Sequence, residues 1–433
     1  MTQCSSALLA TLLLVSCSSK APAGGRATQE ASPAVAETPA PAPQPTPPAG
    51  KDFDAEAKLL YRIVACGGDA PLPATIDAKI VDEYCAWLAP KVDKYRKAYV
   101  DGAEKFLGKI EPPDLPTTVV YPFGGGDLLS AITTYPQAME YTTLSLEHAG
   151  DPRRIDAMDS ATLERSLALF RKSSVGLLTL NDSTSENLMQ LEKADIPGQI
   201  SFFLVGLKIH GFEPVSLRYF TLEPDGAIHY LTAEEIATAE SKIAKKLNQV
   251  WVSPNFSEAF SNVELVFRPA GQPDAATRVH RHIAANLSDE FLKKDDRVLK
   301  HLLAKGKVSA MTKAASYLLW NQAFVRIRNY LLDNMVFMVS DSTGIPPRYA
   351  TKAGFVQETY GQFTGPFLDA SKQHSDDFVK LWSEQPQRAL PFRYGYPEAS
   401  KHWHMLITRR PDAKAAAETA AATPREPAAS PRP

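Results

Sequence analysis

The spacing of apolar residues divides the chain into a helical N-terminal part and a longer part in which helices and strands alternate. Apolar side chains recur at helical spacing across residues 53–64, 76–88 and 92–107, and this periodicity predicts three helices between residues 51 and 110. The run Pro112-Pro113-Asp114-Leu115-Pro116 follows, and clustered prolines end regular structure. We therefore expect a helical segment, 51–110, ahead of a larger folded region.

Beyond residue 111, short apolar runs that are typical of strands alternate with helical patterns. Residues 117–123 predict a buried strand, 124–127 a tight turn, 128–134 a short helix and 139–146 a second strand. The other predicted helices span 161–170, 200–210, 233–247, 291–303, 312–320, 323–334 and 376–383, and the other predicted strands span 215–222, 227–231, 263–268, 277–285, 335–339 and 403–409. No linker or internal repeat interrupts 111–410. The sequence thus predicts one α/β domain, a mixed β-sheet flanked by helices, with a helical N-terminal segment.

The first seventeen residues have the pattern of an export signal. Residues 7–15 form an apolar run that suits the centre of a signal peptide and is too short to span a bilayer. The tetrapeptide Leu14-Val15-Ser16-Cys17 resembles the lipobox of bacterial lipoproteins. The resemblance implies that residues 1–16 are a cleaved signal peptide and that Cys17 becomes an acylated N-terminus. With Ser18 next, it also implies an outer-membrane anchor and a module that faces the periplasm. The alternative is an ordinary secretory signal or an unmodified Cys17.

Proline is concentrated at the two ends of the chain. Eight of the 34 prolines lie in 18–50 and five in 411–433. Segments rich in proline and alanine favour extended polyproline II and cannot bury a core. We expect residues 17–50 to form a disordered tether behind the lipidated Cys17, with a reach of about 100 Å. Residues 411–433 are expected to form a disordered tail.

The remaining cysteines form an even pair. Cleavage removes Cys4 and acylation uses Cys17, which leaves Cys66 and Cys85 in an oxidising compartment. The two cysteines bracket a turn between predicted helices, so we expect a disulfide across a helical hairpin. The alternatives are two free buried thiols or a metal or redox pair, although the chain has no C-x-x-C motif.

Composition and missing motifs mainly exclude classes of function. The chain has 47 Lys and Arg against 49 Asp and Glu, a formal net charge of −2, so it offers no basic face for nucleic acid. The motifs G-x-S-x-G, S-x-x-K, H-E-x-x-H, the P-loop and the EF-hand loop are all missing from the sequence. Their absence leaves open a Ser–His–Asp arrangement built from distant positions. We expect no cofactor.

A glycine-rich turn is the most site-like feature. Gly124, Gly125, Gly126 and Asp127 lie between a predicted strand and a predicted helix, and Glu147 ends the next strand. Glycines let a backbone approach a ligand, and a doubly wound nucleotide-binding sheet has a similar layout, although the third glycine of that motif is missing. The alternatives are a plain structural turn with Asp127 as helix N-cap, a loop for another ligand, or a nucleotide site.

A second polar loop follows the predicted strand 335–339. It supplies the Asp341 carboxylate, three hydroxyls and the nearby Arg348 guanidinium, at the kind of strand end where α/β proteins bind ligands. The alternative is a simple polar turn closed by Gly344 and proline.

Two H-x-H pairs lie on predicted strands. His280 and His282, and likewise His402 and His404, each point to one face of a strand. We expect imidazoles that are solvated or hydrogen-bonded. A metal site is the alternative, and it would need a third ligand such as Asp341 or Glu264.

Three stretches resemble those of an uncharacterised family of bacterial secreted and lipid-anchored proteins. They are residues 121–131 with the later Leu146-Glu147, residues 313–319 and residues 339–346. The resemblance spans about 115–350 and implies no activity, only that Asp127 and Asp341 share one pocket. We expect a membrane-anchored lipoprotein whose periplasmic module binds a ligand or a protein partner. The alternative is a cell-envelope hydrolase with a pocket around Asp127 and Asp341.

Overall fold

The computed structural model describes residues 50–176, 178, 196–242, 257–313, 315–341, 343–362, 372–392, 394 and 404–411. The predicted signal peptide, the expected lipidation site Cys17, the predicted tether up to residue 49 and the predicted tail beyond residue 411 lie outside these residues.

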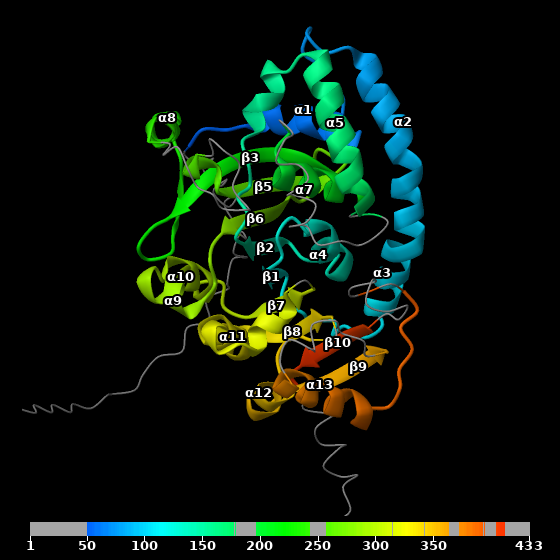
Figure 1. The fold of residues 1–433 in the computed structure, drawn as a ribbon, viewed down its shortest axis with the longest axis vertical. Helices are drawn as coiled ribbons and strands as arrows, with labels where there is room; N and C mark the ends of the chain where they lie inside the picture. The colour runs from blue at the N-terminus through cyan, green and yellow to red at the C-terminus, as the bar shows by residue number, and fades with distance from the viewer. Residues whose placement is uncertain are drawn as a thin grey trace, which may run out of the picture. The chain divides into compact units, whose positions relative to one another are not determined.

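One ten-stranded sheet organises the described part of the chain. Its strands are β1 (Thr118–Pro122), β2 (Glu140–Ser145), β3 (Phe212–Leu222), β4 (Ile228–Tyr230), β5 (Asn262–Pro269), β6 (Arg278–Ala284), β7 (Val308–Thr312), β8 (Met335–Ser340), β9 (Val356–Gly361) and β10 (His404–Arg409). They lie in the order β4-β3-β5-β6-β2-β1-β7-β8-β10-β9 (Figure 1).

Strand direction divides the sheet into a parallel centre and two antiparallel wings. The strands β6, β2, β1, β7 and β8 are parallel. On one side β6, β5, β3 and β4 pair antiparallel, and on the other side β8, β10 and β9 do the same. This confirms the predicted mixed sheet, and it places the carboxyl ends of five neighbouring strands together.

Helices cover both faces of the sheet. One face carries α1 (Asp54–Ala65), α2 (Ala78–Tyr95), α3 (Asp101–Leu107), α4 (Leu128–Thr134), α5 (Ser160–Val175) and α7 (Gly198–Ile209), and the other carries α10 (Arg297–Leu303), α11 (Val325–Asn334) and α12 (Pro347–Lys352). The remaining helices are α8 (Ala233–Ser241), α9 (Asp289–Lys294) and α13 (Lys372–Glu384). Along β1, Val119 and Tyr121 pack against the first layer and Val120 against the second, as strand alternation requires. In the described part of the chain, no helix is both long and apolar enough to cross a membrane.

The helical N-terminal segment contains the expected disulfide. Cys66 at the end of α1 is bonded to Cys85 in α2. The predicted break before residue 92 was wrong, because α2 runs through Pro90 and continues by a π-helical turn, η1 (Arg96–Val100), into α3. Leu88 and Tyr95 on either side of the proline both pack into the main core, and this packing holds the helix together where Pro90 removes one hydrogen bond.

The region 289–320 differs most from the prediction. The expected helix 291–303 is two helices, α9 and α10, because the backbone leaves the helical conformation at Asp295. In place of the expected helix 312–320 the chain forms the central strand β7 and a 3-10 turn, η5 (Ser316–Trp320). All five residues of β7 are buried, so the strand shows no alternation of polar and apolar positions that could mark it. The elements α12 and β9 were also missed.

The outer edge of β9 is covered by the segment that follows α13. The Gln385 side chain donates to the Gln357 carbonyl (3.0 Å), Arg388 donates to the Thr359 carbonyl (3.4 Å), and the Gly361 amide donates to the Arg388 carbonyl (2.8 Å). These bonds occupy backbone groups that an edge strand otherwise leaves open.

Candidate functional site

The turn after β1 positions Asp127 at the start of α4. Its carboxylate accepts from the Ser130 amide (3.1 Å) and from the Tyr121 hydroxyl (3.1 Å), so Asp127 caps α4 as the sequence suggested. A Cβ on Gly124 would lie 2.7 Å from the Tyr121 ring, which explains why this position has no side chain. The Ser130 amide and the Tyr121 hydroxyl together fix the position of the Asp127 side chain.

Lys313, the first residue after β7, faces the same carboxylate. Its Nζ lies 3.7 Å from Asp127 Oδ2, and it donates to the Ser130 hydroxyl at 2.9 Å. The ammonium also lies 5.8 Å from the centroid of the Tyr99 ring. Only 11% of the Lys313 side chain is exposed, so this charge interacts mainly with protein groups.

Asp341, which follows β8, forms the third part of the arrangement. Its Oδ1 accepts from the Thr343 amide (3.0 Å), from the Thr343 hydroxyl (2.9 Å) and from the Ser316 hydroxyl. Burial raises the pKa of Asp341 to about 6, against the opposing effects of Ser316, Thr343 and the Lys313 charge. Lys313 therefore pairs with Asp127 and is close enough to Asp341 for its charge to act on that carboxyl group.

We call these residues the switch-point cluster. Its members are Asp127, Ser130, Lys313, Ser316 and Asp341. They follow the carboxyl ends of three adjacent parallel strands, β1, β7 and β8. The chain goes from β1 to β2 on one side, whereas β7 and β8 lie on the other side. Such a reversal of strand order is where open α/β sheets bind ligands.

Backbone strain gathers beside the same cluster. The described residues include three non-glycine positions with positive φ, and two of them flank the cluster: Phe123 (φ 62°) precedes the glycine turn, and Ala315 (φ 54°) lies between Lys313 and Ser316. Gly125 has a positive φ of 50° in the turn itself. Strained backbone costs about 1–3 kcal/mol per residue and is common at ligand sites.

Two of the nominated residues lie outside the cluster. Glu147 follows β2 and is buried, and its backbone carbonyl accepts from His282 (2.8 Å). Arg348 is the second residue of α12, is exposed, and forms an ion pair with Asp377 of α13. The guanidinium that the sequence offered to the Asp341 loop is thus bound to a different carboxylate, and Lys313 is the cation beside Asp341.

The histidines of β6 are buried, not solvated. His280 and His282 are fully shielded, because β6 lies inside the sheet and Phe203 packs on both rings. His280 Nε2 and His282 Nδ1 lie 2.9 and 3.0 Å from the Thr143 hydroxyl, and His282 Nε2 contacts the Glu147 carbonyl. Burial lowers the pKa of both imidazoles. Both rings are therefore neutral members of a buried hydrogen-bond chain.

The described histidine of the second pair is buried as well. His404 is 1% exposed at the start of β10, and burial lowers its pKa to about 4. This follows from the position of β10 between β8 and β9, where both faces of the strand are covered. His402 lies outside the described residues.

Glu264, considered as a metal ligand, takes part in an ion-pair network instead. Its carboxylate accepts from Arg281 (2.7 Å), which also donates to Glu140 (2.7 Å), and Lys305 pairs with Glu140 as well. Among the described residues there is no group of three or more side chains that could hold a metal ion.

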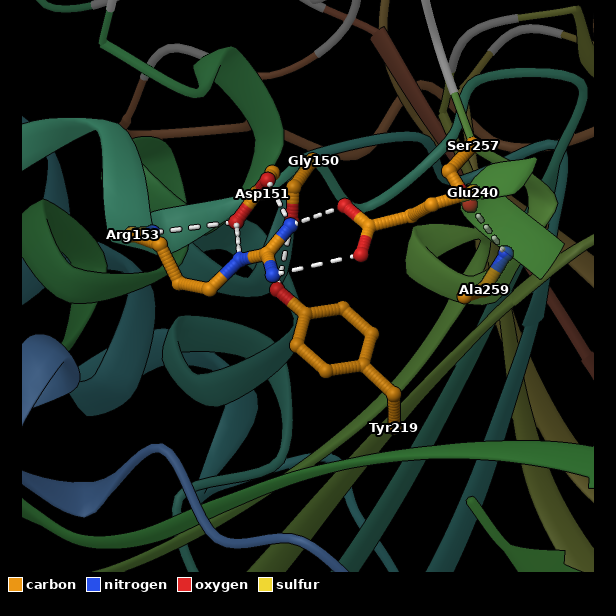
Figure 2. Close-up of polar contacts among 7 residues, drawn as sticks. All are labelled: Gly150, Asp151, Arg153, Tyr219, Glu240, Ser257 and Ala259. Atoms are coloured by element: carbon orange, nitrogen blue, oxygen red, sulfur yellow. Dashed lines mark hydrogen bonds and ion pairs between the residues drawn. The ribbon is translucent and has the colours of Figure 1, made fainter. Parts of the chain in front are cut away.

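A second polar arrangement, around Arg153, has a structural role. Figure 2 shows the guanidinium between the carboxylates of Asp151 and Glu240, with the Tyr219 hydroxyl donating to the Gly150 carbonyl beside it. The Arg153 guanidinium is thus already paired with two carboxylates. The arrangement ties α8 to the 3-10 turn η2 (Pro152–Ala157) and leaves no charge for a ligand.

Comparison of the chain with protein-family models, with curated proteins and with solved structures finds no match. The site therefore rests on its own geometry. Sequence reasoning nominated Asp127 and Asp341 but missed Lys313 as a site residue. One signal in the sequence could have identified Lys313: it directly follows a short run of small and apolar residues, 308–312. Such a pattern is typical of a charged residue at the end of a buried strand.

Proposed function

We propose that this chain is a membrane-anchored lipoprotein of the bacterial cell envelope, and that its α/β module binds a small ligand at the switch-point cluster without catalysis. One observation carries the proposal. Asp127, Lys313 and Asp341 are far apart in sequence and meet at the carboxyl ends of adjacent parallel strands, where the strand order reverses.

The anchoring part of the proposal rests on the sequence before residue 50. The apolar run 7–15, the lipobox residues up to Cys17 and the proline-rich tether together favour a lipid-anchored module on the periplasmic side of the outer membrane. The Cys66–Cys85 disulfide is in keeping with an oxidising compartment.

The contacts of Lys313 favour binding over catalysis. A general base must accept a proton from the serine that it activates. Here the Lys313 Nζ faces the Asp127 carboxylate and donates to the Ser130 hydroxyl, so it acts as a donor and ion-pair partner. In this arrangement the lysine positions Asp127 and a ligand.

A hydrolase is the second candidate, and one contact favours it. The Ser316 hydroxyl donates to Asp341 and follows the positive-φ residue Ala315, so Ser316 is the serine to test as a nucleophile. A fluorophosphonate probe should leave the protein unlabelled if our proposal holds. Labelling that is lost in Ser316→Ala would replace the binding function with hydrolysis.

The binding function is tested by ligand-induced stabilisation of the full-length protein in detergent. Panels of sugars, amino acids and phosphorylated metabolites are added, and the melting temperature is measured for the wild type and for Asp341→Asn. A ligand at 100 times its Kd stabilises a protein by about 2.7 kcal/mol. We expect at least one class to raise the melting temperature of the wild type and to have a smaller effect on the variant. An equal effect on both proteins, or none with any class, would contradict the proposal.

The anchor is tested separately, by mass spectrometry of the mature N-terminus. We expect cleavage before Cys17 and a mass increase from acyl chains, and we expect Cys17→Ala to release the protein from the membrane fraction. Cleavage elsewhere, or an unmodified Cys17, would disprove the anchor and leave the ligand site untouched.

A further inference from the structure

Two buried polar side chains beside the switch-point cluster have no hydrogen-bond partner. Within the described structure, the oxygen and the nitrogen of the Gln199 amide have no hydrogen-bond partner, and the Tyr394 hydroxyl has none either. Both side chains are 1% exposed. Buried polar groups are almost always paired, so unpaired ones need an explanation such as an absent ligand or water.

The Gln199 amide lies over the glycine turn. Gln199 is in the first turn of α7, and its Oε1 would be 2.4 Å from a Cβ added to Gly126. The amide therefore fills the space that a side chain at Gly126 would occupy. Its oxygen is an unused acceptor and its NH2 group carries two unused donor hydrogens, and the amide lies against Gly126, the residue before Asp127.

Packed rings connect Tyr394 to the same cluster. The centroid of its ring lies 6.2 Å from that of Phe392, which lies 6.1 Å from that of Tyr99, the ring beside Lys313. Burial is the largest cause that raises its pKa well above the ordinary value, and the charges of Tyr99, Asp341, Tyr135 and Asp127 raise it further. These groups can act on Tyr394 only from nearby. The phenol is thus held neutral near both aspartates, with its hydrogen-bonding capacity unused.

The groups of the site that lack hydrogen-bond partners are uncharged. Among the described residues of the cluster, two carboxylates are balanced by one ammonium, which leaves an excess of negative charge that repels an anion. The unpaired groups are one amide and one hydroxyl, each able to donate and to accept. A carboxylate or phosphate ligand is therefore disfavoured, and a ligand rich in hydroxyl groups is favoured.

We propose that the ligand is an uncharged saccharide, whose hydroxyl groups bind the Gln199 amide and the Tyr394 hydroxyl while Asp127 and Asp341 accept further bonds from it. The site lies at strand ends in the middle of the sheet, which suits a compact molecule better than an extended peptide. The Tyr99 and Tyr121 rings beside the cluster give a sugar ring apolar surface to pack on. This inference rests on the proposed binding function and names the class of its ligand.

The test measures binding of N-acetylglucosamine and its β-1,4-linked disaccharide by calorimetry, with the full-length protein in a detergent that has no sugar headgroup. Glucose 6-phosphate and alanyl-alanine are the charged and peptide probes. The variants are Gln199→Leu and Tyr394→Phe. We expect each to weaken saccharide binding about tenfold, the value of one hydrogen bond. Each should also keep or raise the melting temperature of the free protein, because a buried unpaired group is removed.

Tyr330→Phe is the matched control. The Tyr330 hydroxyl is buried but donates to the Leu302 carbonyl (3.2 Å) in the opposite helical layer. Its loss should lower the melting temperature and leave saccharide binding unchanged. A merely structural role for Tyr394 would make both phenylalanine variants behave alike and would overturn the assignment.

A further variant tests whether the saccharide binds at another surface. A pocket of about 320 Å³ between β9 and α13 is lined by Trp382 and by glutamines, which is also a surface that could hold a sugar. Loss of saccharide binding in Trp382→Leu but not in Gln199→Leu would overturn the site. If only the dipeptide or the phosphate binds, the saccharide class is wrong while the binding function stands. If no probe binds and the fluorophosphonate labels Ser316, the binding function fails as well.

Discussion

At the scale of single residues, the candidate site depends on one lysine that pairs with Asp127 and acts electrostatically on Asp341. Lys313 and Asp127 are each about 10% exposed as side chains, so neither charge is fully hydrated. Removing one partner of a buried pair leaves the other uncompensated, and that loss exceeds what the pair itself contributes.

Lys313→Met should lower the free energy of unfolding by about 2–3 kcal/mol, because the Asp127 charge stays buried beside an apolar side chain. The double variant Asp127→Asn with Lys313→Met should recover part of this loss, with a coupling of about 1–2 kcal/mol. Urea unfolding of the four proteins measures both values. Lys307→Met, at an exposed lysine near the other end of β7, is the control and should change stability by less than about 0.5 kcal/mol. Strictly additive effects would refute the pairing.

The buried histidines predict loss of stability in acid. Burial is the main cause that lowers the pKa of five of them in the folded protein: His148, His280, His282, His301 and His404. Below pH about 6.5 the unfolded chain binds protons that the folded chain does not. The stabilisation is therefore complete above that pH and is lost as pH falls towards 4.

The two carboxyl groups with the largest upward pKa shifts oppose this trend. Burial raises the pKa of Asp341 to about 6 and of Glu111 to about 7, so these groups stabilise the fold at low pH and lose that effect as pH rises through their folded pKa values. Five histidines outweigh two acids, and the net slope is at most about 4 kcal/mol per pH unit. Thermal unfolding between pH 4 and 7.5 measures it. A melting temperature that stays level from pH 7 to pH 5 would contradict the neutral histidines.

At the scale of elements, the turn between β1 and α4 combines two glycines with different neighbours. A Cβ on Gly124 meets the rigid Tyr121 ring at 2.7 Å, whereas a Cβ on Gly126 meets the end of the flexible Gln199 side chain at 2.4 Å. The same substitution should therefore have different results two residues apart.

Gly124→Ala should cost about 1–3 kcal/mol of stability, as overpacking does. Gly126→Ala should cost less than about 1 kcal/mol, because the amide can move, but it should reduce saccharide binding strongly by displacing Gln199. Denaturation and calorimetry on the two variants measure these effects. Equal losses of stability would show that Gln199 is not free to move, and intact binding in Gly126→Ala would remove it from the site.

The disulfide between α1 and α2 closes a loop over a sequence separation of 19. Constraining the unfolded chain by a loop of this length contributes about 3 kcal/mol. Replacing both cysteines by alanine should lower the unfolding free energy by about that amount and leave ligand binding unchanged, since the pair belongs to neither β1, β7 nor β8. Unfolding with and without reductant checks this: reductant should affect the wild type alone.

The sequence predicted some elements well and missed others for a physical reason. The helix α4 has the predicted bounds because Asp127 caps it and the glycine turn starts it. The strand β7 escaped prediction because it is buried on both faces and contains Ser309 and Ala310, which carry little strand preference. Without β7 in place, nothing in the sequence could bring Lys313 next to Asp127. The two aspartates could be nominated from local pattern, whereas their shared cation required the topology.

At the scale of the whole molecule, the parallel centre of the sheet provides the site and the antiparallel wings provide the edges. The far edge, β9, is covered by Gln385 and Arg388 from the segment after α13. Open strand edges template pairing with other chains, and proteins protect them in this way.

Replacing Gln385 and Arg388 by alanine should expose the edge of β9 and promote association. We expect concentration-dependent oligomers in light scattering, with little change in the fold by circular dichroism. The control is Lys380→Ala on α13, where the side chain is exposed and pairs with Glu384 in a surface ion pair. A double variant as monodisperse as the control would mean that the edge is protected by other means.

The covered edge gains importance from the proposed anchor. Proteins held on a membrane by lipid share a thin layer, so neighbours meet far more often than the same number of molecules in bulk solution. Under that confinement, even a weak tendency to exchange strands would lead to patches of fused sheets. Three hydrogen bonds along β9 would allow the protein to populate a surface densely and still present each ligand site on a separate molecule.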